Sequence, residues 1–285
     1  AYSVIVALVG SGAPLPPLAI VLAGALVAIP VCMAVGFTLE RVAYRPLRNA
    51  PRLAPLITAI GLSIILQHLA MIVWSRNPLP YPQIVQTVSY HVTANPNGAT
   101  ITNVQIAIIA VSVAMMAGLT ALVYRTKLGI AMRATAQNQP VAGLMGIDIN
   151  RVIALTFVIA GGLGSVAGVM VGTYYGIAHY QMGFLLGLKA FSAAVLGGIG
   201  NLAGAMLGGL LLGIIEALGA GYVGDLTNLC HFADWSEALA KRCETDPNVA
   251  LFGSNYQDVF AFAVLILVLV FRPSGLLGER VSDRA

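Results

Sequence analysis

Long apolar segments alternate with short polar connections along the whole chain of 285 residues. The clearest apolar segments occupy residues 14–39, 53–74, 104–124, 152–174 and 257–271. A helix of about 20 apolar residues crosses the hydrocarbon layer of a bilayer, so each segment predicts one membrane-spanning helix. The first ten residues are also apolar, and we expect them to form the outer half of a further, partial helix.

A sixth apolar block, residues 184–222, is too long for one crossing and is interrupted by GGIGN at residues 197–201. Each glycine inside a helix costs about 1 kcal/mol relative to alanine, so this cluster favours a break. We therefore predict a Gly-broken helical hairpin at 184–222. The fold class is all-α: a polytopic integral membrane helical bundle with about seven complete crossings plus the partial N-terminal one.

The composition agrees with a membrane protein, because 58% of the residues are hydrophobic and only 9% are charged. Soluble domains carry about 25% charged residues. The net charge of +4 does not indicate nucleic-acid binding, since the basic residues cluster at the borders of the apolar segments. Contact with membrane lipid accounts for that placement.

The basic residues also orient the chain, because Lys and Arg accumulate in cytoplasmic connections. Eleven of the 15 lie in three regions: Arg41, Arg45, Arg48 and Arg52; Arg125, Lys127, Arg133 and Arg151; and Arg272, Arg280 and Arg284. Placing all three regions in the cytoplasm requires two crossings in residues 184–222. The prediction is one transmembrane domain, residues 1–285, with a cytoplasmic loop at 125–151, an extracytoplasmic loop at 223–256 and a cytoplasmic C-terminus.

The 223–256 loop is acidic and contains Cys230 and Cys243. In an oxidising compartment these two residues are candidates for a local disulfide, and two free thiols are the alternative. Cys32 lies within an apolar segment, where we expect a small buried packing residue.

Glycines recur every fourth residue in two apolar segments. Small residues at this spacing let membrane helices approach closely. The predicted helix-packing residues are Gly164, Gly168, Gly172, Gly200, Gly204 and Gly208.

Ionisable residues within apolar segments are functional candidates. Lys189 and Glu216 lie at similar predicted depth on the two arms of the hairpin, where they form a possible ion pair. Contact with a zwitterionic substrate and independent extension of each side chain to the interface are the alternatives. Asp258 lies at the outer edge of the last segment, and we expect it to have no partner. For Gln67 and His68 we favour a hydrogen bond between helices over a ligand site.

Residues 126–151 are the only long polar connection that carries several basic residues. Ala, Met, Arg and Gln favour a short helix here, and Gly129 and Gly146 bracket it. A helix lying across the cytoplasmic face is a surface that a separate motor protein can push.

Enzyme signatures are absent from the sequence. It contains no G-x-x-x-x-G-K-[ST], HExxH, GxSxG or CxxC pattern, so we predict no catalytic residue, metal site or cofactor site in this chain. The expected role is a transporter subunit that is not an enzyme.

Five segments in order closely resemble the permease subunits of branched-chain amino acid ABC importers. They are ERVAYRPLR (40–48), ITAIGLSIILQ (57–67), RVIALTFVIAGGLGSVAGV (151–169), GLKAFSAAVLGGIGNLAGAMLGGLLLGIIEAL (187–218) and VLVFRPSGLLG (268–278). The resemblance implies inward transport of leucine, isoleucine and valine across the bacterial inner membrane. The implied partners are a second related permease, two ATPase subunits that use ATP and Mg, and an extracytoplasmic binding protein.

The same resemblance places ATPase coupling in RATAQNQPVAGLMGI (133–147). The residues implied in docking are Arg133, Ala134, Ala136, Asn138, Ala142, Gly143 and Gly146. Two alternatives remain open: an ABC permease for urea and short amides, and an ion-coupled secondary transporter that works without ATPases.

Overall fold

The computed structural model describes residues 1–10, 16–51, 54–82, 87–91, 100–198, 200–223, 257–272 and 274–278. The chain divides into two compact units, Ala1–Phe184 and Leu185–Ala285. The possible disulfide between Cys230 and Cys243 lies outside the described residues, as does nearly all of the 223–256 loop.

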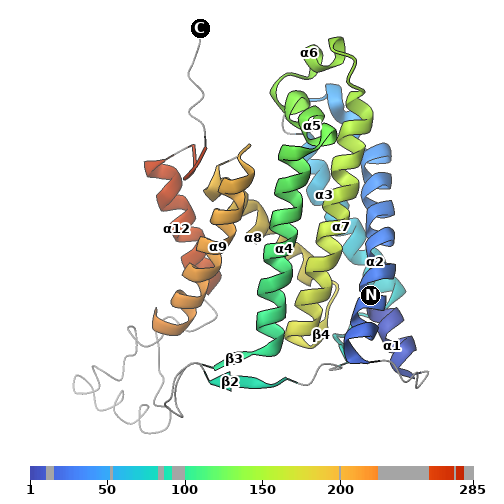
Figure 1. The fold of residues 1–285 in the computed structure, drawn as a ribbon, viewed down its shortest axis with the longest axis vertical. Helices are drawn as coiled ribbons and strands as arrows, with labels where there is room; N and C mark the ends of the chain where they lie inside the picture. Colours follow the sequence, from blue (N-terminus) through green and yellow to red (C-terminus); the bar gives the residue numbers. More distant parts are fainter. Residues whose placement is uncertain are drawn as a thin grey trace. The chain divides into compact units, whose positions relative to one another are not determined.

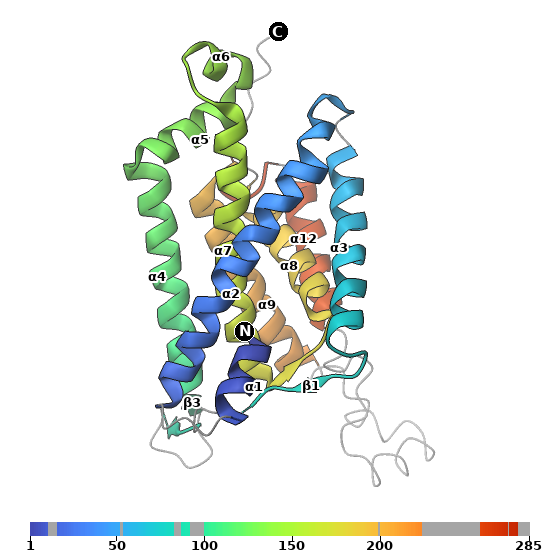
Figure 2. The same cartoon turned by 90° about the vertical axis from the view of Figure 1, so that its right-hand side faces the viewer.

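The first unit is centred on the contact between α2 (Pro17–Leu39) and α7 (Ile149–Tyr175), which cross at an angle (Figure 2). Glycines bring the two backbones together: a Cβ at Gly36 would lie 2.6 Å from the Phe157 carbonyl oxygen, and one at Gly161 would lie 2.5 Å from that of Cys32. Side chains larger than glycine would therefore force these helices apart.

Helix α2 ends at Leu39, where the sequence predicts the end of the apolar segment, but the helical backbone does not stop there. It continues into a π-helix, η1 (Glu40–Tyr44), and then a 3-10 helix, η2 (Pro46–Asn49). Single π-turns are uncommon and occur often at functional sites. Helix α3 (Ala54–Val73) follows this connection.

The end of the first unit that carries α1 (Tyr2–Gly10) holds short strands and a small apolar core. Ile5, Ile20 and Tyr81 form this core. Burial raises the pKa of the Tyr81 hydroxyl above its ordinary value. Strand β1 (Leu79–Pro80) pairs with β4 (Ile177–Ala178), and β2 (Ser89–His91) pairs with β3 (Thr100–Thr102), both antiparallel.

Helix α4 (Asn103–Arg125) begins at a capping box, in which Thr102 and Gln105 each accept from the other's backbone N–H. At its far end the chain turns sharply into α5 (Lys127–Gln137) and α6 (Gln139–Leu144), which lie at one end of α4 and α7 (Figure 1). A Cβ at Gly129 would lie only 2.2 Å from the Val123 carbonyl oxygen, so this turn requires glycine.

The predicted single helix in this connection is therefore wrong: there are two helices. The division falls at Asn138, because Pro140 lacks a backbone N–H and favours a helix start over a continuing helix.

The second unit contains most of α8 (Met182–Gly197), α9 (Leu202–Leu218), a π-turn η3 (Gly219–Val223) and α12 (Gln257–Phe271). Helices α8 and α9 are bent by 120° at the Gly-rich break. Gly198 and Gly200 adopt φ values of +109° and +97° there, which side chains disfavour.

Three described helical segments are long and apolar enough to cross a membrane: Ala19–Tyr44, Asn103–Arg125 and Ile149–Tyr175. The bent pair α8–α9 meets the same criterion when taken together, and α3 and α12 contain shorter apolar stretches. The chain is therefore helical and contains helices that can span a membrane, while the number of crossings remains a prediction.

The structure differs from the predicted glycine packing at three positions. Nothing in the described part of the chain lies within 4 Å of a Cβ built on Gly164, Gly168 or Gly200. Glycines spaced by four residues share a helix face, but that spacing does not indicate which face meets another helix; on α7, Gly161 and Gly162 face α2 instead.

The other three predicted glycines do make close approaches. A Cβ at Gly172 would meet the Tyr81 ring at 3.1 Å. In the second unit, one at Gly204 would lie 2.3 Å from the Gly197 carbonyl oxygen, and one at Gly208 would lie 2.1 Å from that of Ala193. The latter two glycines allow α8 and α9 to touch beside the break.

Candidate functional site

The α5–α6 connection consists of two helices, and a side chain caps the start of each. Thr126 caps α5 by accepting from the Gly129 N–H at 3.1 Å, and Asn138 caps α6 by accepting from the Val141 N–H at 3.3 Å. Gly146 closes the connection at φ +82°, a left-handed turn that favours glycine.

Helix α6 and its C-cap present large apolar side chains outward, whereas Ala142 faces inward. Leu144 is 87% exposed and Met145 is 79% exposed, and Val141 is also exposed, whereas Ala142 is only 3% exposed. We call Val141, Leu144 and Met145 the α6 tip. Three exposed apolar residues on one short helix and its C-cap are typical of an interaction surface.

The residues expected to dock an ATPase are placed differently from one another. Ala136, Asn138, Gly143 and Gly146 are exposed, Ala134 is half-buried and Ala142 is buried. Arg133 lies over the Tyr124 ring, with its guanidinium carbon 5.1 Å from the ring centroid. Sequence reasoning concentrated on the small residues and missed the α6 tip, although its spacing of three and four residues was a readable signal.

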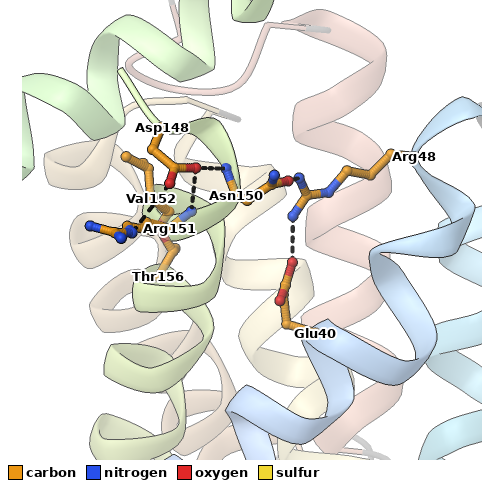
Figure 3. Close-up of polar contacts among 7 residues, drawn as sticks. All are labelled: Glu40, Arg48, Asp148, Asn150, Arg151, Val152 and Thr156. Carbon is orange, nitrogen blue, oxygen red and sulfur yellow. Dashed lines mark hydrogen bonds and ion pairs between the residues drawn. The ribbon is translucent and has the colours of Figure 1, made fainter. Parts of the chain in front are cut away.

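The connection joins α7 through a third cap, at Asp148. The Asp148 carboxylate accepts from the Asn150 and Arg151 backbone N–H groups at 3.1 and 3.2 Å, and it pairs with the Arg151 side chain at 3.2 Å (Figure 3). Asp148 thereby fixes the start of α7 directly after the α5–α6 connection.

A polar bridge crosses from this start of α7 to the end of α2. Arg48 uses two nitrogens of its guanidinium group: Nη1 donates to the Asn150 side-chain oxygen and Nη2 pairs with the Glu40 carboxylate (Figure 3). Glu40 is only 3% exposed, so its charge depends on this partner. We call Glu40, Arg48 and Asn150 the Arg48 bridge. Sequence reasoning missed it because Arg48 was used only as one of the basic residues that orient the chain and as part of the 40–48 motif.

A second charged cluster lies within the second unit and joins its three α-helices. The Lys189 ammonium on α8 lies 3.0 Å from the Glu216 carboxylate on α9 and 2.7 Å from the Asp258 carboxylate on α12. All three side chains are partly exposed. The expectation that Asp258 has no partner is wrong, because α12 packs on α9 and brings its first turn to Lys189.

The polar residues of α3 bond within their own helix. Gln67 donates its amide to the Ser63 hydroxyl at 3.2 Å, and His68 Nδ1 lies 2.9 Å from the Ile64 carbonyl oxygen. The predicted hydrogen bond from these residues to another helix is therefore wrong for the described part of the chain.

A cavity of about 370 Å³ lies beside Ser63 and Gln67 in the first unit, and we call it the Ser63 cavity. Its walls come from the end of α2, from η1, α3 and α7, from the connection before α8 and from the first turn of α8. The lining residues are Leu39, Tyr44, Ala59, Leu62, Ser63, Leu66, Gln67, Phe157, Tyr180, Gly183 and Phe184. Ligand-sized cavities in proteins span about 300–1,000 Å³, so a small metabolite fits this space.

Comparison with known proteins yields one consistent family. The profile described as "Branched-chain amino acid transport system / permease component" matches residues 1–269. The high-affinity branched-chain amino acid transport system permease protein BraD of Pseudomonas aeruginosa is 42% identical over 251 residues, which cover 88% of this chain and 72% of that protein. No solved structure matches the chain.

Two further relatives carry the name LivH and the same description. The Escherichia coli K12 protein is 40% identical over 262 residues, covering 91% of this chain and 75% of the relative. The Salmonella typhimurium protein is 38% identical over 260 residues, with the same coverage of 91% and 75%.

Proposed function

The chain belongs to the branched-chain amino acid transport system permease family, and from that premise we propose that it is the membrane-spanning subunit of an ATP-binding-cassette importer. It carries leucine, isoleucine and valine inward. Separate ATPase subunits drive the movement, and a binding protein delivers the amino acid.

The observation that carries this proposal is the α6 tip on its two capped helices. Leu144 and Met145 are the most exposed large hydrophobic residues of the α5–α6 connection. Large apolar side chains anchor protein interfaces when they enter a groove of the partner. The α6 tip is therefore the part that enters the ATPase, with the small residues Ala136, Gly143 and Gly146 allowing close approach around it.

The caps and the Arg48 bridge give the docking surface a mechanical connection to the membrane helices. A push on α6 reaches α7 through Asp148 and reaches the end of α2 through Asn150, Arg48 and Glu40. Helices α2 and α7 are themselves in direct backbone contact. Movement of the ATPase thus acts on the central helix pair of the first unit.

The wider arrangement follows from the basic residues and the family. The protein lies in the bacterial inner membrane with about seven crossings, a cytoplasmic α5–α6 end and a cytoplasmic C-terminus. Its partners are a second related permease, two ATPases that use ATP and Mg, and an extracytoplasmic binding protein. This chain itself holds no cofactor.

Reconstitution tests the proposal directly. The chain, its partner permease, ATPases and binding protein are placed in lipid vesicles with ATP, and uptake of labelled leucine, isoleucine, valine and urea is compared. We expect uptake of the three amino acids that requires ATP. Uptake of urea alone would replace the substrate assignment, and uptake by the isolated chain under an ion gradient would replace the class of transporter.

The α6 tip has its own test in the same system. Leu144→Ala with Met145→Ala removes two anchors, so ATPase binding to the permease should weaken by tenfold or more, since hot-spot residues each contribute about 2 kcal/mol or more. Ile130→Ala is the matched control, because Ile130 is an exposed apolar residue on α5. Equal loss in both variants would show that α6 has no special role in docking.

A further inference from the structure

The Ser63 cavity combines apolar walls with a few uncharged polar groups. Leu39, Leu62 and Phe157 contribute hydrocarbon surface, while Ser63, Gln67, Tyr44 and Tyr180 contribute hydroxyl and amide groups. No Lys, Arg, Asp or Glu is among the residues that line it. Small-molecule sites typically have this make-up, in which apolar surface supplies contact and a few polar groups fix orientation.

One face of α3 supplies the polar part. Ala59, Ser63 and Gln67 are spaced by four residues and line the cavity, so they lie along a single stripe of the helix. Gln67 donates to Ser63, which leaves the Gln67 carbonyl oxygen and the Ser63 hydroxyl hydrogen for another partner. Within the described residues, the Tyr44 and Tyr180 hydroxyls also make no hydrogen bond.

We propose that the Ser63 cavity is a contact site for the branched-chain amino acid on its way through the permease, an inference that rests on the proposed function. The Gln67 carbonyl oxygen accepts from the ammonium group, and the hydroxyls of Ser63, Tyr44 and Tyr180 donate to the carboxylate. The branched side chain lies against Leu62 and Phe157.

The absence of formal charge from the lining suits a transport site. A transported molecule must bind well enough to enter and weakly enough to leave. A buried carboxylate or guanidinium would hold one end of the zwitterion strongly, whereas neutral dipoles orient both ends without that penalty.

A larger cavity in the first unit offers fewer polar groups, which come from Gln105, Tyr174 and Tyr175 and include no serine. It has a volume of about 420 Å³ between α4 and α7, and most of its lining is aliphatic. The Gln105 side chain that reaches it already accepts from the Thr102 N–H at the start of α4. Hydrocarbon fits that cavity better than a zwitterion does.

The wall of the Ser63 cavity also connects to the Arg48 bridge. Tyr44 lies on the same π-helix as Glu40, and its ring packs on Phe157 of α7 with centroids 4.9 Å apart. Asn150, two turns before Phe157, is the other end of the bridge. A shift of α7 against η1 therefore changes the shape of the cavity and the grip on its occupant.

Substrate size tests the inference in the reconstituted importer. Ala59→Leu adds bulk to the cavity wall, so uptake of leucine should fall about tenfold relative to valine, as expected when a site must lose one methylene of space. Gly61→Leu is the matched control, because Gly61 is on the same helix, is exposed and has no described atom within 4 Å of a built Cβ. Its leucine-to-valine ratio should equal that of the unsubstituted importer.

The ratio decides the outcome even when total uptake falls. If Ala59→Leu abolishes uptake of both leucine and valine, Ala59→Val provides a smaller increase in volume, and the same leucine-to-valine ratio is measured. An unchanged ratio would overturn the inference and would indicate that lipid or a neighbouring helix fills the cavity. The unsubstituted importer serves as the separate check on function: if it takes up no branched-chain amino acid, the proposed function fails, whereas normal uptake with an unchanged ratio in Ala59→Leu removes only this site.

Discussion

Two charged clusters hold helices together in different ways: the Arg48 bridge, and the Lys189 cluster, which is formed by Lys189, Glu216 and Asp258. Arg48 serves a buried carboxylate, Glu40, and a neutral amide, Asn150, so the bridge carries no net charge. Lys189 serves two carboxylates, Glu216 and Asp258, so its cluster carries one excess negative charge.

The difference follows from the shapes of the two cations. A guanidinium group is a planar fork that directs separate N–H groups to separate partners, and it suits a link between a connecting segment and a helix. An ammonium group is a compact point charge that three surrounding helices can share. The bridge is thus suited to transmit a directed movement, and the cluster is suited to hold α8, α9 and α12 together.

Loss of Arg48 should have the largest effect on stability. Arg48→Met leaves the Glu40 carboxylate buried without a partner, so the free energy of unfolding should fall by about 3–5 kcal/mol. Unfolding in detergent measures this change. Adding Glu40→Gln removes the stranded charge and should restore most of the loss; strictly additive losses would show that the two side chains do not pair.

Loss of Lys189 should come next, with a fall of about 3 kcal/mol, because its two carboxylates repel each other but are partly exposed. A double variant that combines the loss of Lys189 with Glu216→Gln should remain destabilised, since Asp258 still carries an unpaired charge. Only the triple variant with Asp258→Asn should recover stability. Full recovery in the double variant would mean that Asp258 is outside the cluster.

Loss of Asn150 should have the smallest effect on stability and a clear effect on coupling. Asn150→Ala removes one hydrogen bond, about 1 kcal/mol, and keeps the Arg48–Glu40 pair. The ATP hydrolysed per leucine imported should rise about threefold, because the link from α7 to Arg48 is cut. Asn150→Asp retains an acceptor for Arg48 and should restore the ratio; an unchanged ratio in Asn150→Ala would make the bridge purely structural.

The two clusters also differ in how far the sequence could reveal them. Charged residues are rare inside apolar segments, so Lys189 and Glu216 stood out, and the Gly-rich break placed them on neighbouring arms. Arg48 lies among several arginines of one connection, and nothing in that pattern distinguishes it from its neighbours. Its partner Asn150 is 102 positions away in the chain.

The α5–α6 connection shows the same limit at closer range. The residue types predicted a helix bracketed by two glycines. They did not indicate that Ala142 faces inward while Leu144 and Met145 face outward. In a helix of only six residues, a change of one position rotates a side chain by about 100°, so composition alone leaves the exposed face open.

The sequence by itself determined the apolar helices, the break at residues 197–201 and the family, because hydrophobic length, glycine and ordered motifs are local properties of the chain. Only the tertiary structure decided which glycines make contact, which carboxylates share Lys189 and where a polar cavity opens beside Ser63. These features depend on distances between residues far apart in the chain, and packing of whole helices sets such distances.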